Sequence, residues 1–308
     1  PTKLCSNKDI LFCVRGSSTG RMNISNDKYC IGRGLASIRG KEKHSLTDFI
    51  YQIMIFNINS ILSFCEGSTF PNISRDNLNN LIITIPPLKE QEKISLILSS
   101  VDKKIENTDN LIEKTKELKK GLIQRLLTKG IGHERFKDTE LGRIPVEWEV
   151  KKLGSYVKLI HGYQFRKEDI VTEGLPIIKI GQISKNGTLD LSNLTYIQEE
   201  RFPKFQEFKI NNEDVLMALS GATTGKVAFV KNINRNMVQN YRVGKMVTVE
   251  EENNNMFLYY QLKSKGFYNQ LMKLCNTSAQ PNFGKQDMDK INMCLPLIKE
   301  QKQIALIL

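Results

Sequence analysis

The sequence has few of the residues that build metal centres and disulfide scaffolds. Its six cysteines and three histidines are scattered along 308 residues, and no two cysteines have CxxC spacing. This pattern disfavours a zinc module and a small disulfide-rich fold. We therefore expect reduced thiols, no bound metal and a cytoplasmic location.

A long uninterrupted apolar run is also absent. The N-terminus, PTKLCSNKDILF, does not have the basic region and apolar core of a signal peptide, and it lacks an initiator Met, so residue 1 is not expected to be a natural start. The most apolar segment, 49–65, is marginally long enough to cross a bilayer, but polar residues, among them Gln52, Asn57, Asn59 and Ser60, interrupt it. Its counterpart at 256–274 is amphipathic, so we predict a core-facing helix in both places.

Catalytic motifs are missing as well. HExxH, GxSxG, an FxGxG cofactor loop and a PD…ExK nuclease pattern do not occur, and IPPL at 85–88 departs from the (Asn/Asp)-Pro-Pro-aromatic motif of amino-methyltransferases. SGATTGK (220–226) departs from a phosphate-binding P-loop in its glycine spacing and in the Val that follows its Lys. A tight strand–turn–strand is predicted there instead. We expect no catalytic residue and no cofactor bound by this chain.

The sequence has an excess of positive charge. The formal net charge is +12 and the isoelectric point is near 9.3. This balance favours a polyanionic partner, either nucleic acid or an acidic membrane surface, against the alternative of a basic surface without a function. The length predicts about two domains.

The sequence also has an internal repeat. IPPLKEQEKISLIL (85–98) and LPLIKEQKQIALIL (295–308) are identical at eight of fourteen positions. DILFCVRGSSTGR (9–21) matches DVLMALSGATTGK (214–226), and GSTFPNIS (67–74) matches TSAQPNFG (277–284), in the same order. Two copies with so long a period indicate a duplicated domain rather than a solenoid.

A long helix is predicted over 89–128, between the copies. Apolar residues recur there at steps of three and four, and acidic residues dominate 90–113 while positive charge gathers near the end. Forty residues span roughly 60 Å, so the seam needs a partner helix. The seam residues expected to pair are Ile97, Val101, Ile105, Ile112, Leu118, Leu122 and Leu126. The second KEQ line, at 297–308, is expected to begin a second such helix.

The second copy has the pattern of a mixed α/β unit after a polar boundary at 129–150. A helix is predicted at 256–274, and strands are predicted at 175–180, 214–220, 226–230, 244–250 and 291–296. We therefore expect an α+β fold in which two similar mixed domains are joined by long helices that pair as an antiparallel coiled coil.

These motifs together resemble the specificity subunit of type I restriction–modification enzymes. The resemblance is based on the duplicated KEQ line, KKGLIQRLLTKG (119–130), LGRIPVEWEVKKLGSYV (141–157) and the paired DILxxxxGxxTG and DVLxxxSGxTTG motifs, and it covers essentially the whole chain. It divides the chain into part of a first target recognition domain (1–88), a first conserved helix (89–130), a second target recognition domain (131–296) and the start of a second conserved helix (297–308). The chain is expected to be truncated at both ends.

The resemblance implies a non-catalytic subunit that binds double-stranded DNA. Each recognition domain would read half of a split target, and the helices would set the unread spacer. The implied partners are two modification (methyltransferase) subunits, which would carry S-adenosylmethionine, and restriction subunits in the full complex. No membrane partner is implied.

Candidate DNA-binding residues lie in loops beside the predicted strands, because polar and basic side chains there can contact phosphates or bases. In the second domain they are Tyr163, Gln164, Arg166, Ser220, Thr223, Thr224, Lys226, Gln239, Asn240, Arg242, Gln280 and Lys285. Their parallels in the first copy are Arg15, Ser17, Ser18 and Arg21. For each of them a solvated turn or a structural cap is the alternative.

Two other classes of function stay open at this point. One is a coiled-coil scaffold whose globular ends bind protein and not DNA. The other, which the missing motifs disfavour, is a methyltransferase or nuclease in its own right.

Overall fold

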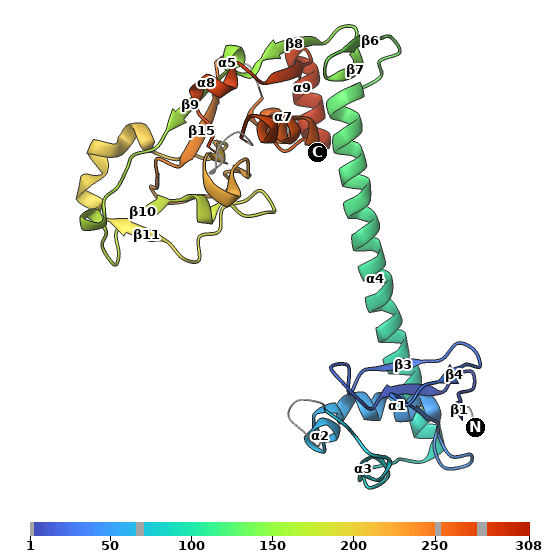
Figure 1. Ribbon diagram of the computed structural model, residues 1–308. Coiled ribbons are helices and arrows are strands. Elements are labelled where there is room, and N and C mark those ends of the chain that lie inside the picture. The colour runs from blue at the N-terminus through green and yellow to red at the C-terminus, as the bar shows by residue number, and fades with distance from the viewer. Residues whose placement is uncertain (1–2, 66–70, 250–253, 276–281) are drawn as a thin grey trace. The chain divides into compact units, whose positions relative to one another are not determined.

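The structure is a computed structural model that describes residues 3–65, 71–249, 254–275 and 282–308. The chain divides into two compact units, Pro1–Lys114 and Thr115–Leu308. One continuous helix, α4 (Leu88–Lys129), begins in the first unit and ends in the second (Figure 1). The prediction of an unbroken helix over 89–128 is therefore confirmed. The α+β fold class is also confirmed.

The first unit is built on a small antiparallel sheet in the order β3-β2-β5. Its strands are Met22–Ile24, Ile10–Cys13 and Leu35–Ile38, and a separate pair joins β1 (Lys3–Leu4) to β4 (Cys30–Ile31). The helices before α4 are α1 (Thr47–Phe56), α2 (Ile58–Ser63) and α3 (Arg75–Asn79). The core consists of apolar side chains from β2, from α1 and α2, and from the loop before α3: Ile10, Phe12, Ile50, Met54, Ile61 and Ile73.

The two predicted core helices are each broken once. The segment 49–65 bends at Asn57, whose side-chain amide donates to the carbonyl of Ile53. The segment 256–274 forms α6 (Asn255–Leu262) and α7 (Lys265–Cys275). Both pairs bury apolar residues, as predicted, but α6 buries the six consecutive residues from Phe257 to Leu262 and is therefore enclosed on more than one face.

The second unit has a four-stranded antiparallel sheet in the order β13-β12-β15-β9. These strands are Val227–Phe229, Val215–Ala218, Val243–Thr248 and Val157–His161. A smaller sheet in the order β11-β10-β14 joins Thr195–Ile197, Leu175–Ile178 and Val238–Gln239. Two-stranded sheets pair β16 (Asn292–Leu295) with β8 (Glu149–Lys152), and β6 (Phe136–Thr139) with β7 (Gly142–Pro145).

Short helices complete the second unit. The α-helices besides α6 and α7 are α5 (Leu153–Tyr156), α8 (Lys285–Met288) and α9 (Ile298–Ile307). The 3₁₀ helices are η1 (Lys167–Asp169), η2 (Ile180–Gln182), η3 (Glu199–Phe208) and η4 (Gly221–Thr223). The five predicted strands are all present, since their apolar runs fill the buried faces of these sheets.

The boundary region 129–150 is folded, because it carries the hairpin β6–β7 and the fully buried Trp148. Trp148 belongs to one large core that also contains Leu126 and Leu127 of α4, Phe257 of α6 and Ile304 of α9. The last turns of α4 are thus part of the second unit's core. Within the described ranges, no helix is both long and apolar enough to cross a membrane.

Candidate nucleic-acid interface

The repeated Gly-rich motif forms the same tight turn in both units. Gly16 and Gly20 have φ values of +83° and +89°, and Gly221 and Gly225, 205 residues later, have +79° and +84°. A positive φ is readily adopted only by glycine, which explains why these positions recur. In each turn the second glycine donates its N–H to the strand before it, at 2.9 Å to the carbonyl of Cys13 or of Ala218. The predicted strand–turn–strand is confirmed for both copies.

The asparagine of the repeated Pro-Asn motif meets this turn in each unit. Asn72 forms a β-bridge with Arg15, and Asn282 forms the equivalent bridge with Ser220. Two motifs that lie more than fifty residues apart in the sequence are thereby held side by side. The sequence repeat therefore encodes one local structure, built twice.

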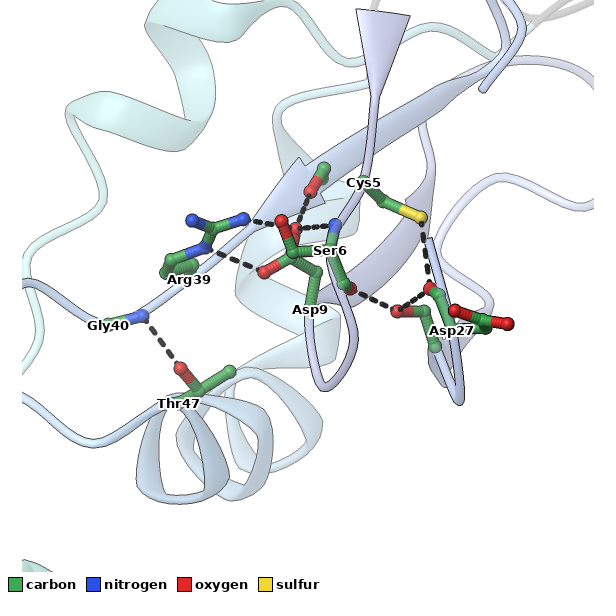
Figure 2. Close-up of polar contacts among 9 residues, drawn as sticks. Cys5, Ser6, Asp9, Asp27, Arg39, Gly40 and Thr47 are labelled. Carbon is green, nitrogen blue, oxygen red and sulfur yellow. Dashed lines mark hydrogen bonds and ion pairs between the residues drawn. The ribbon is translucent and has the colours of Figure 1, made fainter. Parts of the chain in front are cut away.

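The aspartate that opens each strand motif is structural. The carboxylate of Asp9 accepts hydrogen bonds at 2.7 Å from Arg39 Nε and Nη2, from Ser37 Oγ and from the Ser6 N–H (Figure 2). These donors, Arg39 above all, hold the pKa of Asp9 well below its usual range. A buried carboxylate with this many donors is fully used within the fold and is not free to contact DNA.

Asp214 occupies the equivalent place in the second unit with a weaker set of partners. It accepts from the Asn211 N–H at 2.8 Å, and Lys245 Nζ lies 3.5 Å away. Lys245 also donates to the carbonyl of Lys209 at 2.7 Å. Burial is the dominant influence here and raises the pKa of Asp214.

The repeated KEQ line places a buried glutamine near the start of α4 and of α9. In the first unit, Gln91 accepts from the Leu46 N–H at 2.9 Å and donates to the carbonyls of His44 and Pro86 at 3.0 and 2.8 Å. In the second, Gln301 accepts from the Asn254 N–H at 3.4 Å and donates to the Pro296 carbonyl at 3.1 Å. Leu46 and Asn254 are the N-caps of α1 and α6. Each glutamine therefore fastens a domain helix to the start of a KEQ helix.

Glu300 of the second KEQ line adds a polar cluster inside the second unit. Its carboxylate accepts from Trp148 Nε1 at 3.0 Å and from the Ile131 N–H at 3.0 Å, and it lies 2.9 Å from His133 Nε2. These contacts join α9 to the turn that follows α4. Trp148 and Glu300 were not singled out from the sequence because their partnership depends on tertiary structure.

Most of the predicted DNA-binding side chains are accessible. The exposed ones are Tyr163, Gln164, Arg166, Arg242, Lys285, Arg15, Ser17 and Arg21, and Ser18 and Lys226 are half-buried. Tyr163 is 39% exposed, and its ring packs on Phe165, Phe205 and Phe208. Arg15 Nε donates to Asn72 Oδ1 at 2.9 Å. The structure brings Tyr163 next to Asn240 through a β-bridge, but DNA contact by these residues stays a prediction.

Gln239 and Asn240 have to be removed from the predicted set. Gln239 is fully buried on β14 and donates to the Ile160 carbonyl at 2.9 Å, and Asn240 is only 8% exposed. They are buried because β14 runs parallel to β10 inside the unit, an arrangement that the sequence VQNYR does not indicate. An enclosed side chain cannot reach a base edge in this conformation.

The hydroxyls of the second turn are also enclosed. Thr224 is buried and its Oγ1 donates to the Gly221 carbonyl at 2.7 Å. Ser220 Oγ and Thr223 Oγ1 are buried and have no hydrogen-bond partner within the described part of the chain. Base contacts from these three residues are therefore not supported. The predicted residue Gln280 lies outside the described residues.

The seam of α4 is largely open to solvent. Ile97, Val101, Ile105, Ile112 and Leu118 are between 46% and 63% exposed. Leu122 is half-buried and Leu126 is buried in the core of the second unit. Pairing of this seam with another helix stays a prediction.

Two hollows in the second unit are relevant to binding. A groove of about 810 Å³ lies between the last turns of α4, α7 and β16, with Ile123, Phe267 and Met293 on its wall and several lysines among its other residues. A pocket of about 170 Å³ lies beside the second turn and is lined by Lys185, Lys226 and Lys263. Lys185 and Lys263 were missed in the sequence because neither lies in a recognisable motif. Within the described ranges, no group of His, Cys, Asp and Glu side chains is placed to hold a metal ion.

Comparison with known proteins identifies a family. The model of the type I restriction modification DNA specificity domain matches residues 2–117 and 145–308. The type I restriction enzyme MjaVIII specificity subunit of Methanocaldococcus jannaschii is 28% identical over 98% of this chain and 72% of its own length. The putative MjaX specificity subunit of the same organism is 31% identical over 76% of this chain and 53% of its own length. The EcoBI specificity subunit of Escherichia coli is 23% identical over 83% of this chain and 57% of its own length.

Solved structures share the fold. The S subunit of a type I restriction–modification system from M. genitalium aligns over 100% of this chain and 76% of its own, with a TM-score of 0.61 and 17% sequence identity. A chain from a structural study of type I complex assembly and conformational transition aligns over 99% of this chain and 74% of its own, with a TM-score of 0.56 and 16% identity.

Proposed function

The chain belongs to the DNA specificity family of type I restriction–modification enzymes, and from this premise we propose that it reads a bipartite DNA target for its partner subunits. Its family is one of targeting subunits, so the chain is not itself the methyltransferase or the nuclease, as the sequence predicted. The reading as a scaffold without a DNA role is set aside on the same ground.

The observation that carries the bipartite proposal is the duplicated local structure. Each unit has the strand–turn–strand, the Pro-Asn bridge and the buried glutamine of the KEQ line. Two units of the same design on one chain provide two DNA-reading surfaces. Because their exposed side chains differ, the two half-sites are expected to differ in sequence.

Charge and exposed side chains support DNA as the ligand. The net charge of +12 favours a polyanion, and basic contacts to phosphate supply most of the affinity of such a protein for DNA. Arg166 and Arg242 are exposed in the second unit, and Arg15 and Arg21 in the first. An Arg can also read guanine in the major groove through two hydrogen bonds.

The apolar groove and the open α4 seam support protein partners. In this proposal two modification subunits dock on the long helices and on the recognition units, and restriction subunits join the full complex. The modification subunits carry S-adenosylmethionine and transfer its methyl group to adenine, so this chain needs no cofactor. The complex acts in the cytoplasm, where the DNA is.

The test is to map methylated adenines in cells that produce this chain together with its modification subunits. A split motif with two fixed half-sites is expected. Replacing Arg166 and Arg242 with Gln should alter or relax one half-site and leave the other unchanged. Replacing the exposed Lys152 and Lys158 with Gln is the matched control and should leave both half-sites intact. A continuous motif, or simultaneous change of both half-sites, would contradict the proposal.

A further inference from the structure

The pocket beside the second turn is lined by cations. Its wall includes Lys185, Lys226 and Lys263 together with Ser184 and Tyr268, and no carboxylate lines it among the residues that the structure describes. Lys185 follows η2, Lys226 immediately precedes β13, and Lys263 immediately follows α6. The fold therefore brings three positive charges from distant segments to one small hollow.

The three lysines have no compensating partner in the described part of the chain. The ion pairs found there involve other residues, and none includes Lys185, Lys226 or Lys263. Three like charges around one pocket repel one another, and an anion between them would offset that repulsion.

Lys263 shows that this arrangement is held in place. Its Nζ donates to Tyr259 Oη at 3.0 Å and to the Asn186 carbonyl at 3.3 Å. Both acceptors are neutral, so they orient the ammonium group without cancelling its charge. Partial burial accordingly lowers the pKa of Lys263. An anion in the pocket would offset the desolvation of the Lys263 ammonium group.

The second turn fixes the floor of the pocket. Gly225 contributes to the wall with a φ of +84°, and a side chain at this position would collide with Leu271 of α7. The turn thereby places Lys226 at the pocket, at the position where the first copy has Arg21.

We propose that this pocket holds one phosphate of the DNA backbone and fixes the register of the second recognition unit on the duplex. The inference rests on the proposed function and deepens it by assigning a backbone anchor. A phosphate contact positions a protein on DNA but carries no sequence information. The three lysines would therefore contribute equally to every DNA sequence that the protein binds.

The test uses the full chain and a duplex of arbitrary sequence, because phosphate contacts do not require the target sequence. One variant carries Lys185→Gln, Lys226→Gln and Lys263→Gln. The matched control carries Lys152→Gln, Lys158→Gln and Lys204→Gln, which removes the same charge from exposed positions outside the pocket. Circular dichroism melts establish that both variants are folded.

Loss of one phosphate contact should lower the slope of log affinity against log salt by about one. The pocket variant is expected to show this change and to bind more weakly at low salt, with a clearly smaller change in the control. Coincident curves for the two variants would overturn the pocket assignment. A parent protein without salt-dependent affinity for DNA would instead contradict the proposed function itself.

A titration with inorganic phosphate distinguishes a site for a free phosphate ion from a site for a phosphate of the DNA backbone. Titration at constant ionic strength, followed through the NMR signals of Tyr268, measures binding of the free ion. Weak binding that DNA displaces is expected. If inorganic phosphate saturates the pocket and the pocket variant still binds DNA as the control does, the site serves a free anion and the proposal is wrong.

Discussion

At the scale of single residues, equivalent residues of the two units keep the same structural role but bind different side chains. Asp9 and Asp214 begin equivalent strands and each accepts a backbone N–H from three residues earlier. Their cationic partners differ, since Arg39 binds Asp9 through two nitrogens and Lys245 shares its ammonium group with a carbonyl. The pKa of Asp9 is consequently lowered and that of Asp214 is raised.

This difference predicts opposite pH dependence. A carboxyl with a lowered folded pKa stabilises the fold above the usual Asp pKa near 3.9, and loses this contribution as pH falls through the folded pKa. Asp9→Asn should therefore lower the free energy of unfolding by about 2 kcal/mol at neutral pH, and this loss should shrink below about pH 4. Urea unfolding across a pH series measures it.

Asp214→Asn should show the reverse trend. A raised folded pKa means that the protonated form is the favoured one, so the contribution of Asp214 is present at low pH and declines as pH rises above about 4. The penalty of Asp214→Asn should accordingly be larger at low pH than at neutral pH. Parallel pH profiles for the two Asn variants would show that the two sites are equivalent after all.

The buried glutamines yield a third residue-scale prediction. Gln91→Ala leaves the Leu46 N–H and the carbonyls of His44 and Pro86 without their side-chain partner. These groups are only partly buried, so the loss of each hydrogen bond should lower the free energy of unfolding by about 1 kcal/mol. Amide exchange at the start of α1 should accelerate while α6 is unaffected, and the exposed Gln286→Ala should change neither. Equal acceleration in both units would contradict a local role for Gln91.

At the scale of elements, the sequence predicted what is periodic or repeated and missed what depends on distant contacts. The helix over 89–128, the strands and both Gly turns were found because spacing and glycine placement encode them. The break at Asn57 and the burial of Gln239 were not found. A two-residue strand such as β14 has no periodicity to detect, and only its pairing with β10 encloses Gln239.

For some of the candidate DNA-binding residues the sequence was enough to predict exposure, and for others the fold decides it. Basic residues in loops, such as Arg166 and Arg242, are exposed as expected, because their charge keeps them at the surface. The hydroxyls of the second turn are enclosed, and Asn282 and α7 lie against that turn. Lys185 and Lys263 could be assigned only after the fold had placed them beside Lys226.

The open seam of α4 predicts the effect of a charge within it. Ile105 is 56% exposed, so Ile105→Asp should leave the folded chain nearly as stable as before. If a partner helix covers the seam in the complex, the same change should weaken assembly with the modification subunits by several kcal/mol. Glu106→Asp, on a neighbouring face, is the control. Unchanged assembly of the Ile105→Asp variant would show that the seam is not an interface.

At the scale of the whole molecule, the length of α4 predicts the unread spacer of the DNA target. Four residues added within 110–120 supply about one helical turn and lengthen the helix by roughly 6 Å. Base pairs rise about 3.4 Å each, so the spacer should grow by one to two base pairs while both half-sites stay the same. Methylation mapping of the intact system measures the result. An unchanged spacer or altered half-sites would exclude the helix as the ruler.

The way in which Gln91 and Gln301 bind has a consequence for sequence variation at the two junctions. Gln91 contacts the main-chain N–H of Leu46 and the carbonyls of His44 and Pro86, and Gln301 contacts the N–H of Asn254 and the carbonyl of Pro296. Every amino acid offers a carbonyl and all but proline offer an N–H, so these hydrogen bonds would survive a change of side chain at Leu46, His44 or Asn254.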